Sequence, residues 1–265
     1  MKSFLVLLFS LLSCQIYADT FRWCAYFDWP PWIYKNQQAT YSGILIEQLE
    51  LFKVRNPDMS FVMKDIDSWK RCQESVANGS TDFILGANKT PERSVKFHYL
   101  QQPLFINKTV INAYSSFTSG IPNVSALEDL RFYTLALVRG NSYGSPIDGF
   151  VQSLKVGKNK VELSTLSQVM KFVALQRADY FFLPQSSYQK QLEDLNHSND
   201  GNHSEFRFKT VLEIERTTPV YLAFSKKTQA YSVLGERWLK SIEEYYQTVD
   251  CSARVAHHQA QLKHD

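Results

Sequence analysis

One local pattern occurs twice along the chain: a helix ends, an aspartate opens a turn, and a short apolar strand follows. Residues 79–85, Gly-Ser-Thr-Asp-Phe-Ile-Leu, and residues 176–182, Gln-Arg-Ala-Asp-Tyr-Phe-Phe, both show it. Short apolar runs are typical of parallel strands that are buried on both faces. Because helix and strand signals alternate around each run, the chain contains two βαβ-type halves. Two halves of about equal size predict an α/β fold of two lobes rather than one sheet.

The expected elements of the two halves follow the same alternation. In the first half we expect strands at 21–27, 60–66 and 82–87 and helices at 43–54 and 68–77. The second helix begins with Ser68 as its N-cap and stops at Asn78-Gly79. In the second half we expect strands at 132–138 and 180–183 and a helix at 166–176. The remaining expectations are an extended connection at 104–114, an exposed loop at 195–204, a strand at 220–224, a helix at 231–246 and a frayed tail from 253 onwards.

The composition is that of an ordinary globular protein. The chain has 265 residues, of which 44% are apolar and 21% are charged, so neither a disordered nor a fibrous class fits. Its length suits two lobes of about 100–150 residues each. The net charge is only +3 and the charges are interspersed, so no basic stripe indicates binding to nucleic acid. Aromatic residues reach 14%, a high share that suits both a core and an aromatic-lined cleft.

Residues 1–18 have the pattern of a secretory signal peptide. A lysine precedes an apolar run at 4–12, and Ala18 is a small residue suited to cleavage. The run is too short to span a bilayer. We therefore expect an exported mature chain that starts at Asp19 and is soluble. The alternative is a lipoprotein anchored at Cys14, because residues 11–14, Leu-Leu-Ser-Cys, fit a bacterial lipoprotein box.

Export places the cysteines in an oxidising compartment. Cys24 lies in the first expected strand and Cys72 in an expected helix of the same lobe, so we predict a disulfide between them. Cys251, near the C-terminus, would then be the odd cysteine. No CxxC or cysteine–histidine spacing suggests zinc, and we expect neither a metal nor another cofactor.

A segment rich in tryptophan and proline, residues 28–32, follows the first expected strand. Ligands of α/β folds bind at the carboxyl ends of strands. Two prolines restrict the backbone here, so Trp29 and Trp32 are held stiffly. A fixed indole face suits a ligand with flat or cationic parts. We expect Trp29 to contact the ligand, whereas Trp32 is better explained as part of the core.

A polar cluster follows the apolar strand at 82–87. Asn88 and Thr90 offer short polar side chains, and Arg93 offers a planar guanidinium that fits a carboxylate bidentately. The alternative is a surface arginine paired with an acid, an arrangement that contributes little to stability. The chemistry of the residues leaves both interpretations open.

These residues resemble the periplasmic amino-acid-type solute-binding proteins, the bacterial extracellular solute-binding protein family 3. The resemblance covers most of residues 20–110 and is looser over 125–250. The matching pieces are Trp-Pro-Pro-Trp at 29–32, Gly43, Trp69, Asn78-Gly79, Asp82, Thr-Pro-Glu-Arg at 90–93, Gly-Asn-Ser at 140–142 and Arg-Ala-Asp at 177–179. A cysteine in the first strand together with Trp-Lys-Arg-Cys at 69–72 is similar to an exported subgroup, which supports the Cys24–Cys72 pairing.

The resemblance implies a type II clamshell of two α/β lobes that closes on a small ligand, with two crossover strands as the hinge. Lobe 1 would comprise residues 19–110 and 216–250, and lobe 2 residues 111–215. Residues 251–265 would form a flexible tail. Arg93 would grip an α-carboxylate. The other ligand contacts would come from Trp29, Trp69, Asn88 and Thr90 of lobe 1 and, at a helix N-terminus of lobe 2, from Asn141 and Ser142.

One departure from the family concerns the ammonium group of an amino-acid ligand. Relatives that bind α-amino acids usually carry a carboxylate shortly after the strand that Asp179 opens, but Pro184 and Gln185 stand there in this chain. Gln185 can accept a hydrogen bond from the ligand but cannot neutralise its charge. Two explanations stay open: Asp28 or another acid substitutes, or the ligand is not a standard α-amino acid.

The sequence therefore predicts a monomeric, non-enzymatic periplasmic protein that captures a small polar, carboxylate-bearing solute by lobe closure. Its partner would be an ABC-transporter permease or a membrane sensor. One alternative is a dehydratase-like enzyme on the same clamshell, with Asp28 or Glu92 as acid or base. Another is an interaction module with a degenerate pocket. A binder leaves its ligand unchanged, an enzyme consumes it, and an interaction module binds no small solute.

Overall fold

The structure is a computed structural model that describes residues 19–36, 38, 40–198 and 205–262. The predicted signal peptide, residues 1–18, and the alternative anchor at Cys14 lie outside this part of the chain. Every helix within the described residues is too short or too polar to cross a lipid bilayer.

Lobe 1 is built around three parallel strands, β1 (Asp19–Cys24), β4 (Met59–Met63) and β5 (Phe83–Asn88). The helices α1 (Ile44–Arg55) and α2 (Trp69–Asn78) connect them in turn. The short strands β2 (Tyr34–Lys35) and β3 (Tyr41–Ser42) pair with each other before α1. The helix α3 (Pro91–Lys96) and the strand β6 (Phe97–Tyr99) follow β5.

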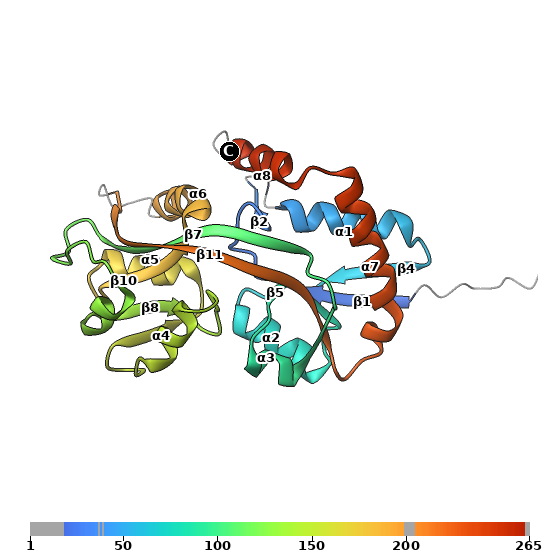
Figure 1. The fold of residues 1–265 in the computed structure, drawn as a ribbon, viewed down its shortest axis with the longest axis horizontal. Helices are drawn as coiled ribbons and strands as arrows, with labels where there is room; N and C mark the ends of the chain where they lie inside the picture. The colour runs from blue at the N-terminus through green and yellow to red at the C-terminus, as the bar shows by residue number, and fades with distance from the viewer. Residues whose placement is uncertain (1–18, 37, 39, 199–204, 263–265) are drawn as a thin grey trace, which may run out of the picture.

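Two long strands connect lobe 1 with lobe 2. The strand β7 (Phe105–Ser116), green in Figure 1, enters lobe 2, and β11 (Phe208–Ser225), orange in the same figure, returns beside it. Between them lie the 3-10 helix η1 (Leu127–Phe132), β8 (Leu135–Val138), α4 (Ile147–Ser153), β9 (Lys160–Leu163), α5 (Leu166–Ala174), β10 (Tyr180–Pro184) and α6 (Gln185–His197). The chain ends in α7 (Ala230–Thr248) and α8 (Cys251–Gln261).

The strands of both lobes, apart from the separate β2–β3 pair, belong to one sheet with the order β4-β1-β5-β11-β7-β10-β8-β9, and β6 pairs with β11 beside this path. The set β4-β1-β5 is parallel, and so is the set β10-β8-β9. In each set, the strand that comes first in the sequence lies in the middle: β1 lies between β4 and β5, and β8 lies between β10 and β9. The prediction of two similar βαβ halves is confirmed. The expectation that the lobes do not share a sheet is wrong, because the antiparallel pair β7 and β11 bonds to both sets.

The aspartate of each repeated segment has the same structural role in its lobe. Asp82 accepts a hydrogen bond from the backbone N–H of Arg22 at 2.8 Å and donates its own N–H to the Arg22 carbonyl at 2.7 Å. Asp179 accepts from the N–H of Thr134 at 2.6 Å and donates to the Thr134 carbonyl at 2.9 Å. This reciprocal pair ties the residue before β5 to Arg22 within β1, and the residue before β10 to Thr134 immediately before β8. It is the physical reason for the repeat in the sequence.

The limits of α2 agree with the prediction from the sequence. The Ser68 side chain accepts a hydrogen bond from the N–H of Arg71, which satisfies one of the free donors of the first turn. Gly79 follows the last turn with a φ of +86°, a left-handed conformation that glycine adopts without a steric penalty. Helix α2 carries both Trp69 and Cys72. Its two limits therefore fix the positions of a candidate ligand contact and of one cysteine of the disulfide.

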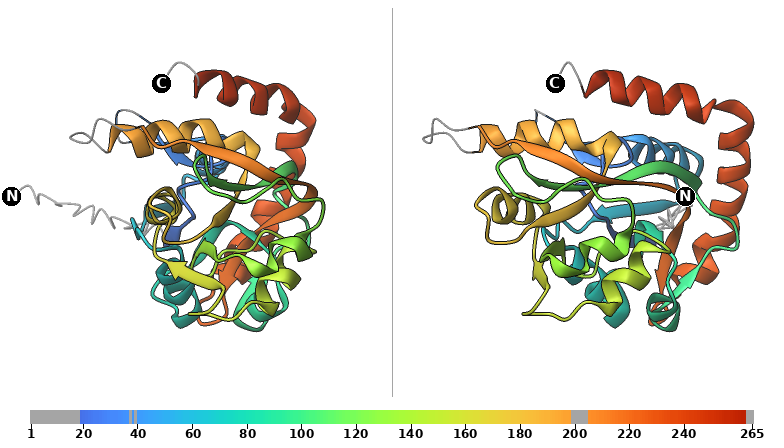
Figure 2. Two further views of the ribbon diagram at one scale, coloured as in Figure 1. Left: turned by 90° about the vertical axis from the view of Figure 1, so that its left-hand side faces the viewer. Right: turned by 60° about the vertical axis from the view of Figure 1, so that its left-hand side comes forward.

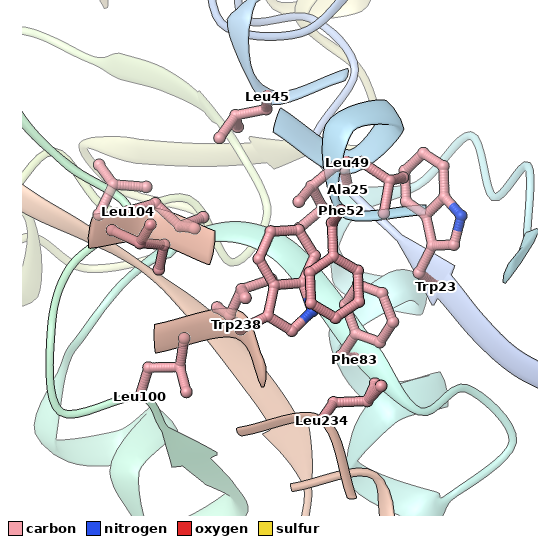
Figure 3. Packing of buried hydrophobic residues seen from close by; sticks show 14 of the residues in the cluster. Trp23, Ala25, Leu45, Leu49, Phe52, Phe83, Leu100, Leu104, Leu234 and Trp238 are labelled. Carbon is pink, nitrogen blue, oxygen red and sulfur yellow. The ribbon is translucent and has the colours of Figure 1, made fainter. Parts of the chain in front are cut away.

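The core of lobe 1 combines residues from both ends of the chain. Trp238 of α7 stacks on Phe52 of α1 with ring centroids 4.0 Å apart, and both side chains are fully buried. Figure 3 shows the two rings together, with Phe83 of β5 and Leu234 of α7 nearby. Lobe 1 is therefore complete only when α7 has packed against α1.

The predicted disulfide between Cys24 and Cys72 is present. It joins β1 to α2 with a Cα–Cα distance of 5.9 Å, and both cysteines are fully buried. Their cluster of buried side chains contains residues of both lobes, among them Trp69 of α2 and Leu166 of α5. The disulfide thus fixes α2 on the sheet directly behind the surface that packs against lobe 2.

The C-terminal residues form a docked helix, so the prediction of a flexible tail over residues 251–265 is wrong for α8. Figure 2 shows α8 turning sharply away from α7 and running along the outside of the molecule. His258 is only 3% exposed, and its Nε2 lies 3.1 Å from a carboxylate oxygen of Glu47 on α1. Arg254 forms an ion pair with the same carboxylate at 3.2 Å. The tail was expected to be flexible because its sequence is polar. Its partner Glu47 lies some 200 positions earlier in the chain, so no local pattern indicates the contact.

Two further expectations concern segment limits. Helix α6 continues through His197, so the start of the expected loop at 195–204 is helical, and residues 199–204 lie outside the described part of the chain. The predicted limits of the lobes, after residue 110 and after residue 215, fall within β7 and β11. These limits stay a prediction.

We predict that removal of the disulfide by the double substitution Cys24→Ala and Cys72→Ala lowers the melting temperature by about 10 °C. The bond spans a sequence separation of 48 residues. In the chain-entropy model a loop of this length contributes about 4 kcal/mol, and each kcal/mol corresponds to about 2–4 °C at this chain length. Differential scanning calorimetry measures the change, with the reduced wild-type protein as control. An unchanged melting temperature would contradict the prediction.

Candidate functional site

A cavity of about 70 Å³ lies between the two lobes. On this scale a water molecule needs about 10–15 Å³, so the cavity has room for about five to seven waters or a small solute of similar bulk. Its polar lining comes from lobe 1 (Asp28, Asn88, Arg93), from lobe 2 (Asn141, Ser142) and from the crossover strands (Asn107, Thr109, Arg216, Thr218). Aromatic side chains, including Tyr26, Trp29, Trp69 and Tyr143, complete it.

Arg93 lies in the first turn of α3 with its side chain 7% exposed. The helix begins there because the Thr90 side chain accepts a hydrogen bond from the Arg93 N–H at 3.3 Å and Pro91 occupies the first position. The guanidinium donates one N–H to the Asn88 carbonyl and one to the Gly140 carbonyl, each at 2.8 Å. Two of its five N–H groups are thus used, both on neutral acceptors. Burial lowers the pKa of Arg93, but an arginine remains charged.

The carbonyl of Gly140 joins lobe 2 to lobe 1. It accepts hydrogen bonds from Arg93 at 2.8 Å, from Gln73 Nε2 at 3.0 Å and from Trp69 Nε1 at 3.1 Å. Gly140 has a φ of +76°, and an added Cβ would lie 3.0 Å from the Gln73 amide nitrogen, so only glycine fits without a shift. Asn88 of lobe 1 adds a hydrogen bond to the Ser142 carbonyl at 2.9 Å. Together these bonds hold the lobes in a closed arrangement.

The two tryptophans of the site have different surroundings. Trp69 is 4% exposed, and the guanidinium carbon of Arg93 lies 5.4 Å from its ring centroid, in a cation–π contact. Trp29 is only half-buried and lies 6.2 Å from Trp32 and 6.0 Å from Phe105, measured between ring centroids. Trp32 itself stacks on Phe105 at 3.7 Å as part of the core. Trp29 therefore keeps part of its surface uncovered at the cavity, whereas Trp69 is buried against Arg93.

The crossover strands provide one wall of the cavity. Thr109 of β7 pairs with Arg216 of β11, and Asn107 pairs with Thr218, so alternate residues of both strands face the cavity. Our sequence analysis missed these four residues. A strand through residues 214–218 would have placed Arg216 and Thr218 on the same face. We expected no strand before residue 220, so this face was not recognised.

Asp28 lies in the same cavity as Arg93. Burial raises the pKa of Asp28 to about 6, and the negative charge of Asp194 adds to the rise. A hydrogen bond from the backbone N–H of Leu166, at the N-terminus of α5 in lobe 2, opposes it. A carboxylate with a raised pKa in a cleft is typical of a functional site. The acid that the sequence offered as a substitute for the family's missing carboxylate is thus present at the site.

Charges within the cavity are not balanced by the protein. The arginine ion pairs of the described residues involve Arg22, Arg55, Arg131, Arg139, Arg207, Arg237 and Arg254, and neither Arg93 nor Arg216 is among them. Asp28 has no ion pair within the described chain either. Two cations and one anion therefore line one small cavity, and no residue in the described part of the chain forms an ion pair with any of them.

Six of the eight ligand contacts predicted from the sequence line this cavity: Trp29, Trp69, Asn88, Arg93, Asn141 and Ser142. Thr90 lies outside it and acts through the N-cap of α3. Gln185 is not brought to the site, because α6 begins at this residue and turns it toward a separate groove beside Lys108 and Thr217. Pro184 occupies the cavity wall instead, so the expectation for Gln185 needs correction.

Comparison with known proteins rests on structure. No protein-family model matches the sequence, and no curated protein matches it. A histidine kinase sensor domain with similarity to periplasmic binding proteins superimposes with a TM-score of 0.68 at 16% identity, over 92% of this chain and 95% of that chain. The chain has the fold of the periplasmic binding proteins.

Two binding proteins with bound amino acids are similar to this chain to the same degree. An amino acid ABC transporter substrate-binding protein of Streptococcus pneumoniae bound to L-arginine gives a TM-score of 0.69 at 16% identity, over 92% of this chain and 95% of that chain. An ancestral arginine-binding protein bound to arginine gives 0.67 at 16% identity, over 92% and 97%. The periplasmic-binding-protein-like clamshell with two crossover strands, predicted from the sequence, is confirmed.

We predict that Asp28→Asn stabilises the protein at neutral pH. Because the folded-state pKa is raised from 3.8 to about 6, the contribution of Asp28 to stability is favourable below 3.8 and is lost as the pH rises through about 6. The amide removes this cost and can still accept the Leu166 N–H. The expected gain at about pH 7.5 is on the order of 2 kcal/mol, or about 5 °C in melting temperature.

The gain should disappear as the pH falls to about 4, where Asp28 of the wild type is protonated. Thermal melts across this pH range measure it. Glu215→Gln removes an exposed carboxylate on the outward face of β11 and is the matched control, with no expected change in the pH profile. Equal melting temperatures for Asp28→Asn and the wild type at neutral pH would refute the assignment.

Proposed function

We propose that this protein is a periplasmic binding protein that captures a small polar, carboxylate-bearing solute between its lobes by closure. The observation that carries the proposal is the position of Arg93. Its guanidinium is nearly fully buried, lines the cavity, contacts backbone carbonyls of both lobes and has no carboxylate partner within the described residues.

A buried cation without a counterion is energetically costly for a protein. Three N–H groups of Arg93 remain after its two hydrogen bonds to carbonyls. A ligand carboxylate would satisfy two of them in the bidentate geometry that guanidinium groups favour and would neutralise the charge. The cation–π contact with Trp69 and the two hydrogen bonds to carbonyls hold the guanidinium in place, so the site is organised before the ligand arrives.

Asp28 supports an amino-acid-like solute. Its carboxylate lines the same cavity, desolvation there raises its pKa, and no cationic partner contacts it within the described chain. An ammonium group of the ligand would supply that partner and lower the pKa again. Of the two explanations that the sequence left open for the missing acid near Pro184, this geometry favours substitution by Asp28.

Arg93 and Asn88 form hydrogen bonds that link the two lobes, and these bonds suggest how a solute would favour closure. Both residues belong to lobe 1, and both donate hydrogen bonds to backbone carbonyls of lobe 2. A solute that contacts Arg93 and the lobe 2 residues Asn141 and Ser142 would bind the closed form better than an open one. It would therefore shift the population toward closure.

The partner would be a membrane protein that reads the closed form. The structural relatives include the substrate-binding protein of an amino acid ABC transporter and a histidine kinase sensor domain, so both an ABC permease and a membrane sensor suit the proposal. The expected form is a monomer in the periplasm after cleavage near Ala18.

An enzymatic function is less well supported by the site. Of the two candidate acids for a dehydratase-like reaction, Glu92 is exposed and lies in a groove outside the cavity. Asp28 alone would then have to act as both acid and base. A binder returns its solute unchanged, which mass spectrometry of the solute after incubation with the protein tests directly. An interaction module would show no response to any small solute.

We predict that a carboxylate-bearing solute raises the melting temperature of the wild type and that Arg93→Ala loses most of this rise. At a hundredfold excess over the dissociation constant, binding stabilises by about 2.7 kcal/mol, or about 5–10 °C. Differential scanning fluorimetry with a panel of amino acids, organic acids and small amines measures the effect.

Two control variants separate charge from structure. Gln73→Ala removes one of the three donors to the Gly140 carbonyl without touching the cavity, and Gln185→Ala removes the side chain that the structure places outside it. Both should retain most of the solute-induced rise. A carboxylate that stabilises Arg93→Ala as strongly as the wild type would show that Arg93 is not the anion site.

A further inference from the structure

We propose that Arg216 of the crossover strand β11 is a second anion-binding residue and that the solute is a compact dicarboxylate. This inference rests on the proposed function, since it assigns the other end of a solute whose first carboxylate binds Arg93. Neither Arg216 nor the anion subsite around it was indicated by the sequence pattern or by the resemblance to solute-binding proteins.

Arg216 is held in place by neutral groups. Its Nε donates to the Tyr143 carbonyl at 3.4 Å, and one terminal nitrogen donates to the Thr218 hydroxyl at 3.3 Å. These long hydrogen bonds orient the guanidinium toward the cavity but leave its charge uncompensated. Its remaining N–H groups have no acceptor within the described chain, so they are free to donate to a ligand.

Gly144 creates the space in which this guanidinium lies. The residue has a φ of +79°, and an added Cβ would lie 2.3 Å from a terminal nitrogen of Arg216. Any other residue would therefore displace the side chain. The backbone of lobe 2 thus approaches Arg216 as closely as a glycine allows, which places the charge at the boundary between lobe 2 and the hinge.

Asn107 is an independent sign that this wall receives a ligand. It is only 8% exposed, yet its side-chain amide makes no hydrogen bond to any described residue. Asn107 pairs across the ladder with Thr218, and Arg216 pairs with Thr109, so the amide and the guanidinium occupy neighbouring rungs on one face. An amide that lines the cavity without a protein partner is available for hydrogen bonds to a ligand.

The charges of the cavity specify the solute. Arg93, Arg216 and Asp28 are its charged lining residues in the described chain, which gives a formal charge of +1 when Asp28 is ionised and +2 when it is protonated. A monocarboxylate would leave one guanidinium without a counterion in a closed space. Two carboxylates neutralise both, and an additional ammonium group would pair with Asp28. An amino dicarboxylate therefore matches all three charges, and a plain dicarboxylate matches two of them.

The test compares solutes that differ by one charge. We expect L-aspartate to bind the wild type at least tenfold more tightly than L-asparagine, and more tightly than succinate, which lacks the ammonium group that pairs with Asp28; isothermal titration calorimetry at fixed ionic strength measures the affinities. In Arg216→Gln the preference should fall to within about threefold, because the amide cannot neutralise the second carboxylate. The variant should still bind L-asparagine, since Arg93 remains.

Two further variants separate a charge effect from loss of structure. Arg216→Lys keeps the charge and should retain a clear preference for the dicarboxylate, whereas a purely structural role would be lost in both variants. Lys108→Gln removes a charge from the outward face of the neighbouring strand β7, outside the cavity, and should leave the preference unchanged.

Several outcomes would overturn the inference. Equal affinities of L-aspartate and L-asparagine in the wild type would do so, as would a dicarboxylate preference that survives in Arg216→Gln. Binding of L-asparagine alone would contradict the dicarboxylate while leaving the proposed function intact. If none of the three solutes binds, the dicarboxylate inference fails, and the broader thermal-shift panel decides separately whether the proposed function fails with it.

Discussion

The antiparallel pairing of β7 with β11 is the interaction on which the architecture depends. Residues 105–116 pair with residues 208–220, and each strand also pairs with a strand set of one lobe, β11 with β5 and β7 with β10. The two lobes are therefore joined by backbone hydrogen bonds rather than by a flexible linker. Because alternate side chains of this pair line the cavity, a change in the angle between the lobes would also move Arg216 and its neighbours relative to a bound solute.

Arg93 connects the chemistry of the site with the relative position of the lobes. The same guanidinium that would receive a carboxylate donates to the Asn88 carbonyl in lobe 1 and to the Gly140 carbonyl in lobe 2. Trp69 both makes a cation–π contact with this guanidinium and donates to the Gly140 carbonyl. Removal of any one of these groups would therefore affect both solute affinity and closure, which is why variants at neighbouring positions are needed to separate the two effects.

Local patterns in the sequence predicted the parts of the structure that local contacts determine. The caps of α2 depend on residues a few positions apart, and the short apolar runs after the repeated aspartates indicated β5 and β10. The predictions failed where distant segments decide. The docking of α8 depends on Glu47, and the inward face of β11 becomes visible only once its pairing with β7 is known. Gln185 stands next to a wall residue in the sequence, but the start of α6 turns it outward.

The packing of Trp238 against Phe52 has a consequence for the order in which the two lobes can fold. Every strand and helix of lobe 2 between β7 and α6 is contiguous, so this lobe has its own core before the last fifth of the chain is made. Lobe 1 lacks the end of β11 and all of α7 until then, and its apolar face around Phe52 would stay uncovered. During synthesis from the N-terminus, the lobe that begins first would thus be completed last, and its apolar face would stay exposed until α7 has been made.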